Sequence, residues 1–235
     1  MKYRTRPHKY KMERELLKTK INEIKRLVDN NSEYIKVQED DYKRILDNCK
    51  NQYELAQAEN DTLLFLMEYK QIYLKGALML IVSTFEFFLK NLYRETLKQN
   101  PNKEGNKSIV ASMVEYIVKE KCIKLNGATL HTFNSIKEIV LVRNTLVHED
   151  AQLYMKRKNY NVEEHKGKEM NSREQQIIRH LKKHESVKII DQLKWGNIDR
   201  IDFYLSPNYI KFVCNVILYF YYSFTKIIAL KSNRK

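Results

Sequence analysis

The longest run of regularly spaced apolar residues extends from about Asp61 to about Leu97, and it constrains the fold more than any other feature of the chain. Apolar side chains return in it every three or four residues, which is the spacing of one helical face. Gln99-Asn100-Pro101-Asn102 ends the run, because proline cannot continue a helix. The segment therefore predicts one long, strongly apolar helix.

Turn-forming residues are rare, since the 235 residues include only 5 Gly and 3 Pro. Short strands would need more such residues between them, so long helices are favoured. Further helices are expected from Ser108 to about Cys122, from about Thr132 to Val147, and from Ser206-Pro207 to about Leu230. Val187 to Leu193 and Ile198 to Leu205, joined by Trp195-Gly196-Asn197, are compatible with a small β-hairpin. We predict an all-α helical bundle that leaves room for one hairpin before the last helix.

The first sixty residues have a thinner apolar pattern than the rest. One amphipathic helix is expected from Met12 to Asn30, stopped at Asn30-Asn31, and a second from about Glu39 to Ala58. We therefore predict a basic N-terminal helical arm at residues 1–60 and a helical domain at residues 61–235. Within that domain the periodicity fades between Asp150 and Glu185, which predicts an irregular polar and basic excursion.

Arg143 interrupts the apolar stripe of the helix that ends near Val147. A structural interpretation is that its stem lies at the core edge and its charge reaches Glu86 or Glu138, while His148 is favoured at the helix C-terminus by the macrodipole. Asn144 and His148 are four residues apart and share a helix face, whereas Arg143 and His148 are about 140° apart. The three side chains therefore gather on one helix end without forming a same-face pair.

The sequence Arg143-Asn144-Thr145-Leu146-Val147-His148 resembles the Arg-polar-x-x-x-His signature of the HEPN superfamily, which consists of small all-helical domains. The apolar stretch around Glu86 resembles the long second helix of these domains and its embedded acidic residue. The resemblance extends from about Asp61 to Leu230 and implies an HEPN-like bundle. Many members of the superfamily are metal-independent ribonucleases, and many of those are dimers in which two motifs face each other.

This resemblance implies that Arg143 binds the scissile phosphate and that His148 acts as general acid or base. Asn144 would orient the imidazole or the phosphate, and Glu86 would support Arg143. The implied products are a 2′,3′-cyclic phosphate and a 5′-hydroxyl, and the implied biological role is that of a toxin or antiphage defence effector. The superfamily also includes inactive members, so an RNA-binding, nucleotide-binding or assembly module is the alternative.

A formal net charge of +14 favours an anionic partner, for which RNA is our prediction. Basic residues concentrate in the first twenty residues and between Lys156 and Lys183, although such runs can also be solvated faces. The candidate RNA-binding residues are Lys156, Arg157, Lys158, Arg179, Lys182 and Lys183. We also expect a homodimer, because the motif helix and the aromatic last helix together carry much apolar surface. A cognate antitoxin or defence-system protein is a further expected partner.

Metal, disulfide and membrane roles are not predicted. Cys49, Cys122 and Cys214 are far apart and show no pairing motif. His180 and His184 have helical metal-ligand spacing, but the surrounding cations oppose a divalent ion. The apolar run from Phe212 to Phe224 is shorter than a membrane span. We therefore expect a cytoplasmic protein without a cofactor.

Overall fold

The computed structural model describes residues 7–58, 64–101, 108–148, 152–156, 172–183, 188–195 and 198–232, and all structural statements below concern these ranges. The helices are α1 (Pro7–Asp47), α2 (Gln52–Ala58), α3 (Leu64–Leu97), α4 (Ile109–Glu120), α5 (Gly127–His148), α6 (Ser172–Lys183) and α7 (Pro207–Ser232). The strands are β1 (Gln152–Lys156), β2 (Lys188–Trp195) and β3 (Ile198–Tyr204). The predicted all-α bundle is confirmed as the body of the fold.

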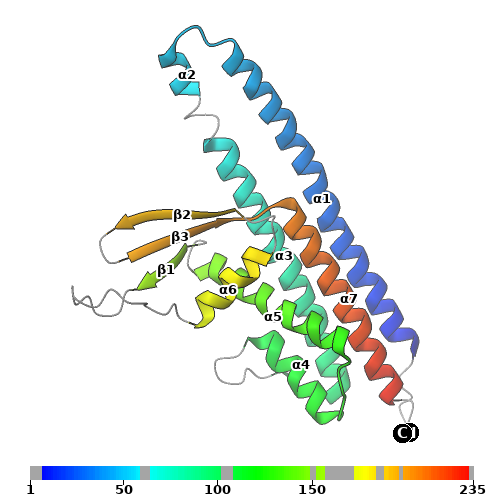
Figure 1. Ribbon diagram of the computed structural model, residues 1–235. Coiled ribbons are helices and arrows are strands. Elements are labelled where there is room, and N and C mark those ends of the chain that lie inside the picture. The colour runs from blue at the N-terminus through cyan, green and yellow to red at the C-terminus, as the bar shows by residue number, and fades with distance from the viewer. Residues whose placement is uncertain are drawn as a thin grey trace, which may run out of the picture.

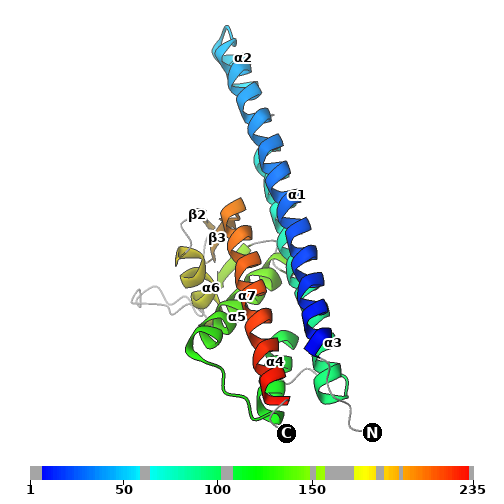
Figure 2. The ribbon, with the colours of Figure 1, turned by 90° about the vertical axis from the view of Figure 1, so that its right-hand side faces the viewer.

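Three long helices form the centre of the molecule, with α3 and α7 both antiparallel to α1 (Figures 1 and 2). Leu17, Ile21 and Val28 of α1 are buried in the same core as Phe85 of α3 and Phe220 of α7. Helices α4 and α5 pack on the lower part of α3, and α5 also packs on α7. The first half of the predicted arm is therefore part of the main core, while the far end of α1, α2 and the start of α3 project beyond the bundle.

The expected break at Asn30-Asn31 is wrong, because α1 continues through it to Asp47. Val28, Ile35 and Tyr42 are buried at seven-residue intervals across this point, so the inward face extends past the two asparagines. The Asn31 side chain forms a hydrogen bond with Tyr73 of α3. Asparagine often ends an isolated helix, but here contacts with α3 outweigh that weak local preference.

The expected helix starts are largely confirmed. Ser108 caps α4, since its Oγ accepts a hydrogen bond from the Ala111 N–H at 3.1 Å. Ser206 does the same for α7, accepting from the Tyr209 N–H at 3.1 Å. Helix α5 begins five residues before the expected Thr132, because Asn126 acts as a cap and not as the first residue of a turn.

A three-stranded antiparallel sheet lies beside the helices in the order β1-β3-β2 (Figure 1). The predicted hairpin is confirmed as β2 and β3, with Ile189 opposite Phe203. The sheet adjoins α3 through Gln71, whose buried amide donates to the Leu205 carbonyl at 3.0 Å and accepts from the Leu205 N–H at 2.8 Å. This two-point contact mimics strand pairing and attaches the end of β3 to the core.

The irregular excursion expected at Asp150–Glu185 is wrong where the structure describes it. Strand β1 pairs with β3, with Leu153 opposite Ile201. Helix α6 packs on the bundle through the buried side chains of Ile177 and Leu181. Both elements depend on partners far away in the sequence, which a short polar segment does not reveal.

Two helical stretches, Glu68–Leu97 and Pro207–Lys231, are long and apolar enough to cross a membrane when judged by length and composition alone. In each, 44% of the most apolar window is buried inside the protein. Core helices of soluble proteins also meet these criteria, so the finding is weak evidence for a membrane span.

Candidate active site

Helix α5 carries the motif and fixes the position of Arg143. The helix is anchored at its start, where Asn126 Oδ1 accepts from the Thr129 N–H at 2.8 Å. Its middle is held in the core by buried Ile136, Ile139 and Val140. The stripe then reaches Arg143, whose side chain is 23% exposed and lies at the edge of the core. The predicted interruption of the apolar face is therefore a partly buried cation one turn before the helix end.

Arg143 belongs to a cluster of four polar side chains from α3 and α5. Its Nη1 donates to Asn144 Oδ1 at 2.9 Å, and its Nη2 lies 3.7 Å from Glu86 Oε2. Glu86 is paired more closely with Lys90, whose Nζ is 2.8 Å from Glu86 Oε1. The Arg143 Nε is buried and has no hydrogen-bond acceptor among the described residues. Of the two carboxylates expected to pair with Arg143, the structure selects Glu86.

The charges in this cluster do not balance. Lys90 and Arg143 contribute two positive charges, and Glu86 contributes the single negative charge of the four side chains. A separation of 3.7 Å is within ion-pair range but too long for a hydrogen bond. A guanidinium in a purely structural pair would be expected to form two short, parallel bonds to its carboxylate. Among the described residues, Arg143 therefore keeps excess positive charge and N–H donors that an anion such as a phosphate could use.

His148 is the last residue of α5. Its side chain lies outside the described part of the structure, so the expected approach of imidazole and guanidinium to one phosphate stays a prediction. Asn144 faces Arg143 and holds its guanidinium through the amide oxygen. This contact places Asn144 against Arg143, and the predicted role of Asn144 toward His148 stays a prediction.

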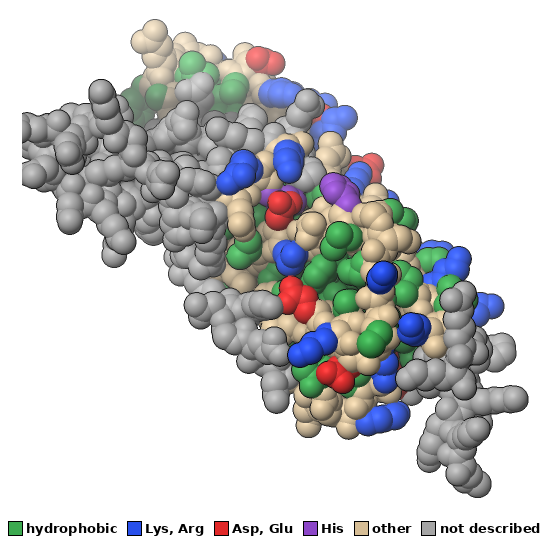
Figure 3. Space-filling model, turned by 60° about the horizontal axis from the view of Figure 1, so that its bottom comes forward, with side chains coloured by type: hydrophobic (Ala, Val, Ile, Leu, Met, Phe, Trp, Pro, Cys, Tyr) green, Lys and Arg blue, Asp and Glu red, His purple; other side chains and the backbone are tan. Residues whose placement is uncertain are grey.

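The predicted RNA-binding residues fall into two groups. Arg179 and Lys183 are exposed on α6. Lys156 ends β1 and Lys182 lies in α6, but their side chains are outside the described set, as are Arg157 and Lys158 altogether. On the face shown in Figure 3, lysine and arginine side chains are scattered among apolar ones and do not gather in one patch. That these residues and Arg143 form one RNA-binding surface stays a prediction.

A buried contact that we did not predict from the sequence connects α5, α6 and α7. His180 Nδ1 lies 2.8 Å from Glu138 Oε2, and His180 Nε2 lies 2.9 Å from the Tyr209 hydroxyl. The imidazole is 1% exposed, and Tyr209 is fully buried. Burial raises the pKa of Tyr209 well above 10, and the charge of Glu138 raises it further. These three residues resemble a catalytic relay in chemistry, but His180 and Tyr209 are buried and only Glu138 is partly exposed, so we interpret them as the attachment of α6 to the bundle.

The sequence contained a signal for this contact. Ile177, His180 and Leu181 recur at spacings of three and one, which would place them on one face of a short helix. His180 was instead considered with His184 as a metal ligand, a role that the surrounding cations oppose. Among the described residues, no group of three His, Cys, Asp or Glu side chains is arranged to hold a metal ion.

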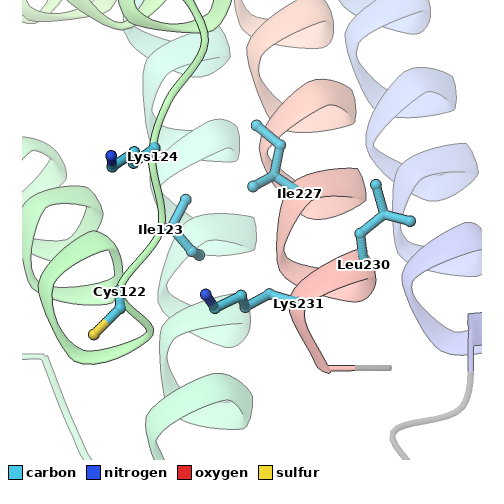
Figure 4. A pocket seen from close by; sticks show the side chains of 6 residues that line it. All are labelled: Cys122, Ile123, Lys124, Ile227, Leu230 and Lys231. Atoms are coloured by element: carbon cyan, nitrogen blue, oxygen red, sulfur yellow. The ribbon is translucent and has the colours of Figure 1, made fainter. Parts of the chain in front are cut away.

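A hollow of about 380 Å³ lies between the end of α7 and the segment that follows α4 (Figure 4). It is lined by Cys122, Ile123, Lys124, Ile227, Leu230 and Lys231. None of the residues predicted for catalysis lines it. With two lysines, one exposed thiol and otherwise apolar walls, it offers no acid–base pair and is not our candidate site.

No protein-family model, no curated protein and no solved structure matches this chain. The interpretation of the Arg143 cluster therefore rests on its residues and geometry and on the resemblance of its motif.

Proposed function

We propose that the protein is a metal-independent endoribonuclease of HEPN type, acting as a toxin or an antiphage defence effector in the cytoplasm. The observation that carries the proposal is the excess positive charge of Arg143 at the end of α5. Among the described residues the guanidinium donates to Asn144 at 2.9 Å, and its one ion-pair contact is the long one with Glu86, which Lys90 already pairs. Arg143 lies within two helical turns of His148. Metal-free RNA cleavage requires a permanent positive charge, such as a guanidinium, and a side chain that can exchange a proton near neutral pH, for which histidine is the suitable residue type.

In the proposed reaction a base removes the proton of a ribose 2′-hydroxyl, and the 2′-oxygen attacks the adjacent phosphorus. The bond from phosphorus to the 5′-oxygen breaks, and an acid protonates that oxygen, which leaves a 2′,3′-cyclic phosphate and a 5′-hydroxyl. Arg143 would stabilise the charge that grows on the phosphate oxygens, with Asn144 holding the guanidinium in place. His148 would supply the acid or the base, and a second copy in a homodimer would supply the other.

The second candidate function is an inactive module that binds RNA or a nucleotide or assembles with a partner protein. It is favoured by the contacts that Arg143 already makes within the chain, to Asn144 and Glu86. Both functions use Arg143 to hold a phosphate, but only the ribonuclease requires His148. A cognate antitoxin or defence partner is compatible with either.

The test is cleavage of tRNA and mRNA by the purified protein in the presence of EDTA, compared with His148→Ala and Arg143→Ala. Each substitution should slow cleavage at least about 100-fold, as expected for loss of an acid–base or charge-stabilising group. His131→Ala is the matched control, because His131 is an exposed histidine on the same helix and should leave the rate unchanged. Cleavage by His148→Ala at the wild-type rate, or RNA left intact by the wild type, would replace this proposal with the inactive module.

A further inference from the structure

The surface of the bundle with most exposed apolar area is not on the helices expected from the sequence. Helix α5 exposes Leu130 and Val147, and α7 exposes Tyr219, Tyr222 and Leu230. Helices α1 and α3 together expose more than twice as many large apolar residues. Those that form what we call the outer hairpin face are Met12, Leu16, Leu27, Tyr34 and Val37 of α1 and Tyr69, Ile72, Met79, Leu80 and Phe87 of α3, each 39–70% exposed.

The ten residues lie on one side of the paired helices. On an ideal helix those of α1 occupy a sector of about 80° and those of α3 a sector of about 100°. Both sectors point away from α7. Arg14, which bonds to Thr225 of α7 at 2.7 Å, is on the opposite side of α1, and Phe85, whose ring lies 6.1 Å from that of Phe220, is on the opposite side of α3. Since α1 and α3 also pack against each other, the two stripes form one surface.

This face is nearly free of unpaired charge, although the chain has a formal net charge of +14. The outward positions of α3 from Ile72 to Phe87 include Gly76 and Ser83 and no charged residue. Within the α1 sector Glu23 is paired with Lys20 at 3.1 Å, and just beyond Val37 Asp41 is paired with Arg44 at 3.1 Å. Arg26 is an exposed cation at the edge of the sector. An RNA or an anionic lipid surface would find few free cations here, whereas a second copy of the same face would meet little repulsion.

The area also fits a second copy. With large side chains presenting about 150–250 Å² each when fully exposed, the ten residues leave roughly 900 Å² open to solvent. Single patches on monomeric proteins reach about 300–600 Å², and a stable interface buries about 800 Å² on each partner. On α3 the outward residues Ile72, Gly76, Met79 and Ser83 alternate at spacings of four, three and four, which is the seam spacing of paired helices.

We propose that the outer hairpin face is a homodimer interface, in which the α1–α3 hairpins of two copies pack face to face around a twofold axis. Gly76 lies near the middle of the seam, and a Cβ added there would meet no other atom of the chain within 4 Å. In the proposed dimer this open space is occupied by the second copy. The proposal concerns assembly: a dimer that leaves RNA intact would keep this interface and overturn only the ribonuclease, whereas a monomer would also remove the second copy that the proposed reaction uses.

The test is the molar mass of the full chain by light scattering and sedimentation equilibrium at micromolar concentrations. The wild type should be a dimer. Gly76→Glu should raise the dissociation constant at least tenfold, because it places two like charges across the twofold axis, while the open space and the better helix propensity of Glu should preserve the monomer fold. Gly127→Glu is the matched control, since that glycine at the start of α5 has equally open surroundings and lies off the face.

Circular dichroism of each variant establishes that the helices are intact. A monomeric wild type, or a dimer that Gly76→Glu and Ile72→Asp leave unchanged, would overturn the proposal. So would a dimer that Tyr219→Glu on α7 dissociates instead. A monomeric wild type that floats with neutral phosphatidylcholine vesicles, and loses this on Gly76→Glu, would assign the face to a lipid surface and not to a second copy.

Discussion

Replacing Tyr209 with phenylalanine removes one oxygen atom from the buried contact that attaches α6 to α5 and α7. In the wild type the Tyr209 hydroxyl lies 2.9 Å from His180 Nε2, inside the protein. The phenylalanine ring fills the same space, so the change isolates one hydrogen bond. A buried polar group that loses such a bond costs about 1–3 kcal/mol. We expect Tyr209→Phe to lower the free energy of unfolding by that amount at pH 7, and the melting temperature by about 2–4 °C per kcal/mol.

The loss of unfolding free energy that Tyr209→Phe causes should become smaller at high pH. Burial first, and the charge of Glu138 second, raise the pKa of Tyr209 above its ordinary value of 10.0. The folded state then holds the phenolic proton after the unfolded chain has released it. The protonated Tyr209 hydroxyl makes its full contribution to the free energy of unfolding below pH 10. This contribution is lost as the pH rises toward the pKa of the folded state, by about 1 kcal/mol between pH 10 and pH 11. Phenylalanine has no proton to lose, so it avoids this decline.

Urea unfolding followed by circular dichroism at 222 nm, at pH 7, 10 and 11, measures both effects. Tyr219→Phe is the matched control, because Tyr219 lies on the same helix and is 50% exposed. It should change stability little at any of these pH values. An unfolding free energy for Tyr209→Phe equal to that of the wild type at pH 7, or a deficit that stays constant up to pH 11, would show that the hydroxyl is not buried against His180.

Two further predictions concern thiol reactivity and RNA binding. Burial raises the pKa of the Cys214 thiol to about 11, so at pH 8 about one thiol in a thousand is ionised. Iodoacetamide should therefore label the exposed Cys122 well before Cys214 in the native protein. Equal labelling rates would mean that α7 is not packed as described. Lys11, Lys18 and Lys20 are exposed on α1. Replacing all three with glutamine should weaken RNA binding, measured by fluorescence anisotropy, and should flatten the slope of log affinity against log salt concentration by about 2. An unchanged slope would assign these lysines to a solvated face.

The sequence predicted the elements whose signals are local. Helix α4 carries its own serine cap, and α7 begins at Ser206-Pro207 as expected. Strands β2 and β3 pair on the two β-compatible segments that were expected to form a hairpin. The pairing of Glu86 with Arg143 was also predictable, because a charge in each of two apolar helices needs a partner.

The elements that were missed depend on distant contacts. Strand β1 gains its hydrogen bonds from β3, more than forty residues later. Helix α6 is stabilised where His180 meets Glu138 and Tyr209 on two other helices. The second half of α1 is continued by packing on α3, against the local preference of two asparagines. In each case the free energy comes from tertiary contacts, and a window of ten or fifteen residues does not contain the partner.

Helix α3 shows why apolar periodicity alone could not locate the open surface. A helix that is apolar on all sides is usually surrounded by other helices, and the stretch from Ile72 to Phe87 is of that kind. The chain covers α3 with α1, α4, α5 and α7, yet Ile72, Leu80 and Phe87 stay exposed. An apolar sequence of this kind is expected to be covered on every side, and the described helices leave part of α3 uncovered. Their apolar character is accounted for when the remaining cover comes from a second hairpin, so the excess hydrophobicity of α3 and the proposed dimer interface have one physical cause.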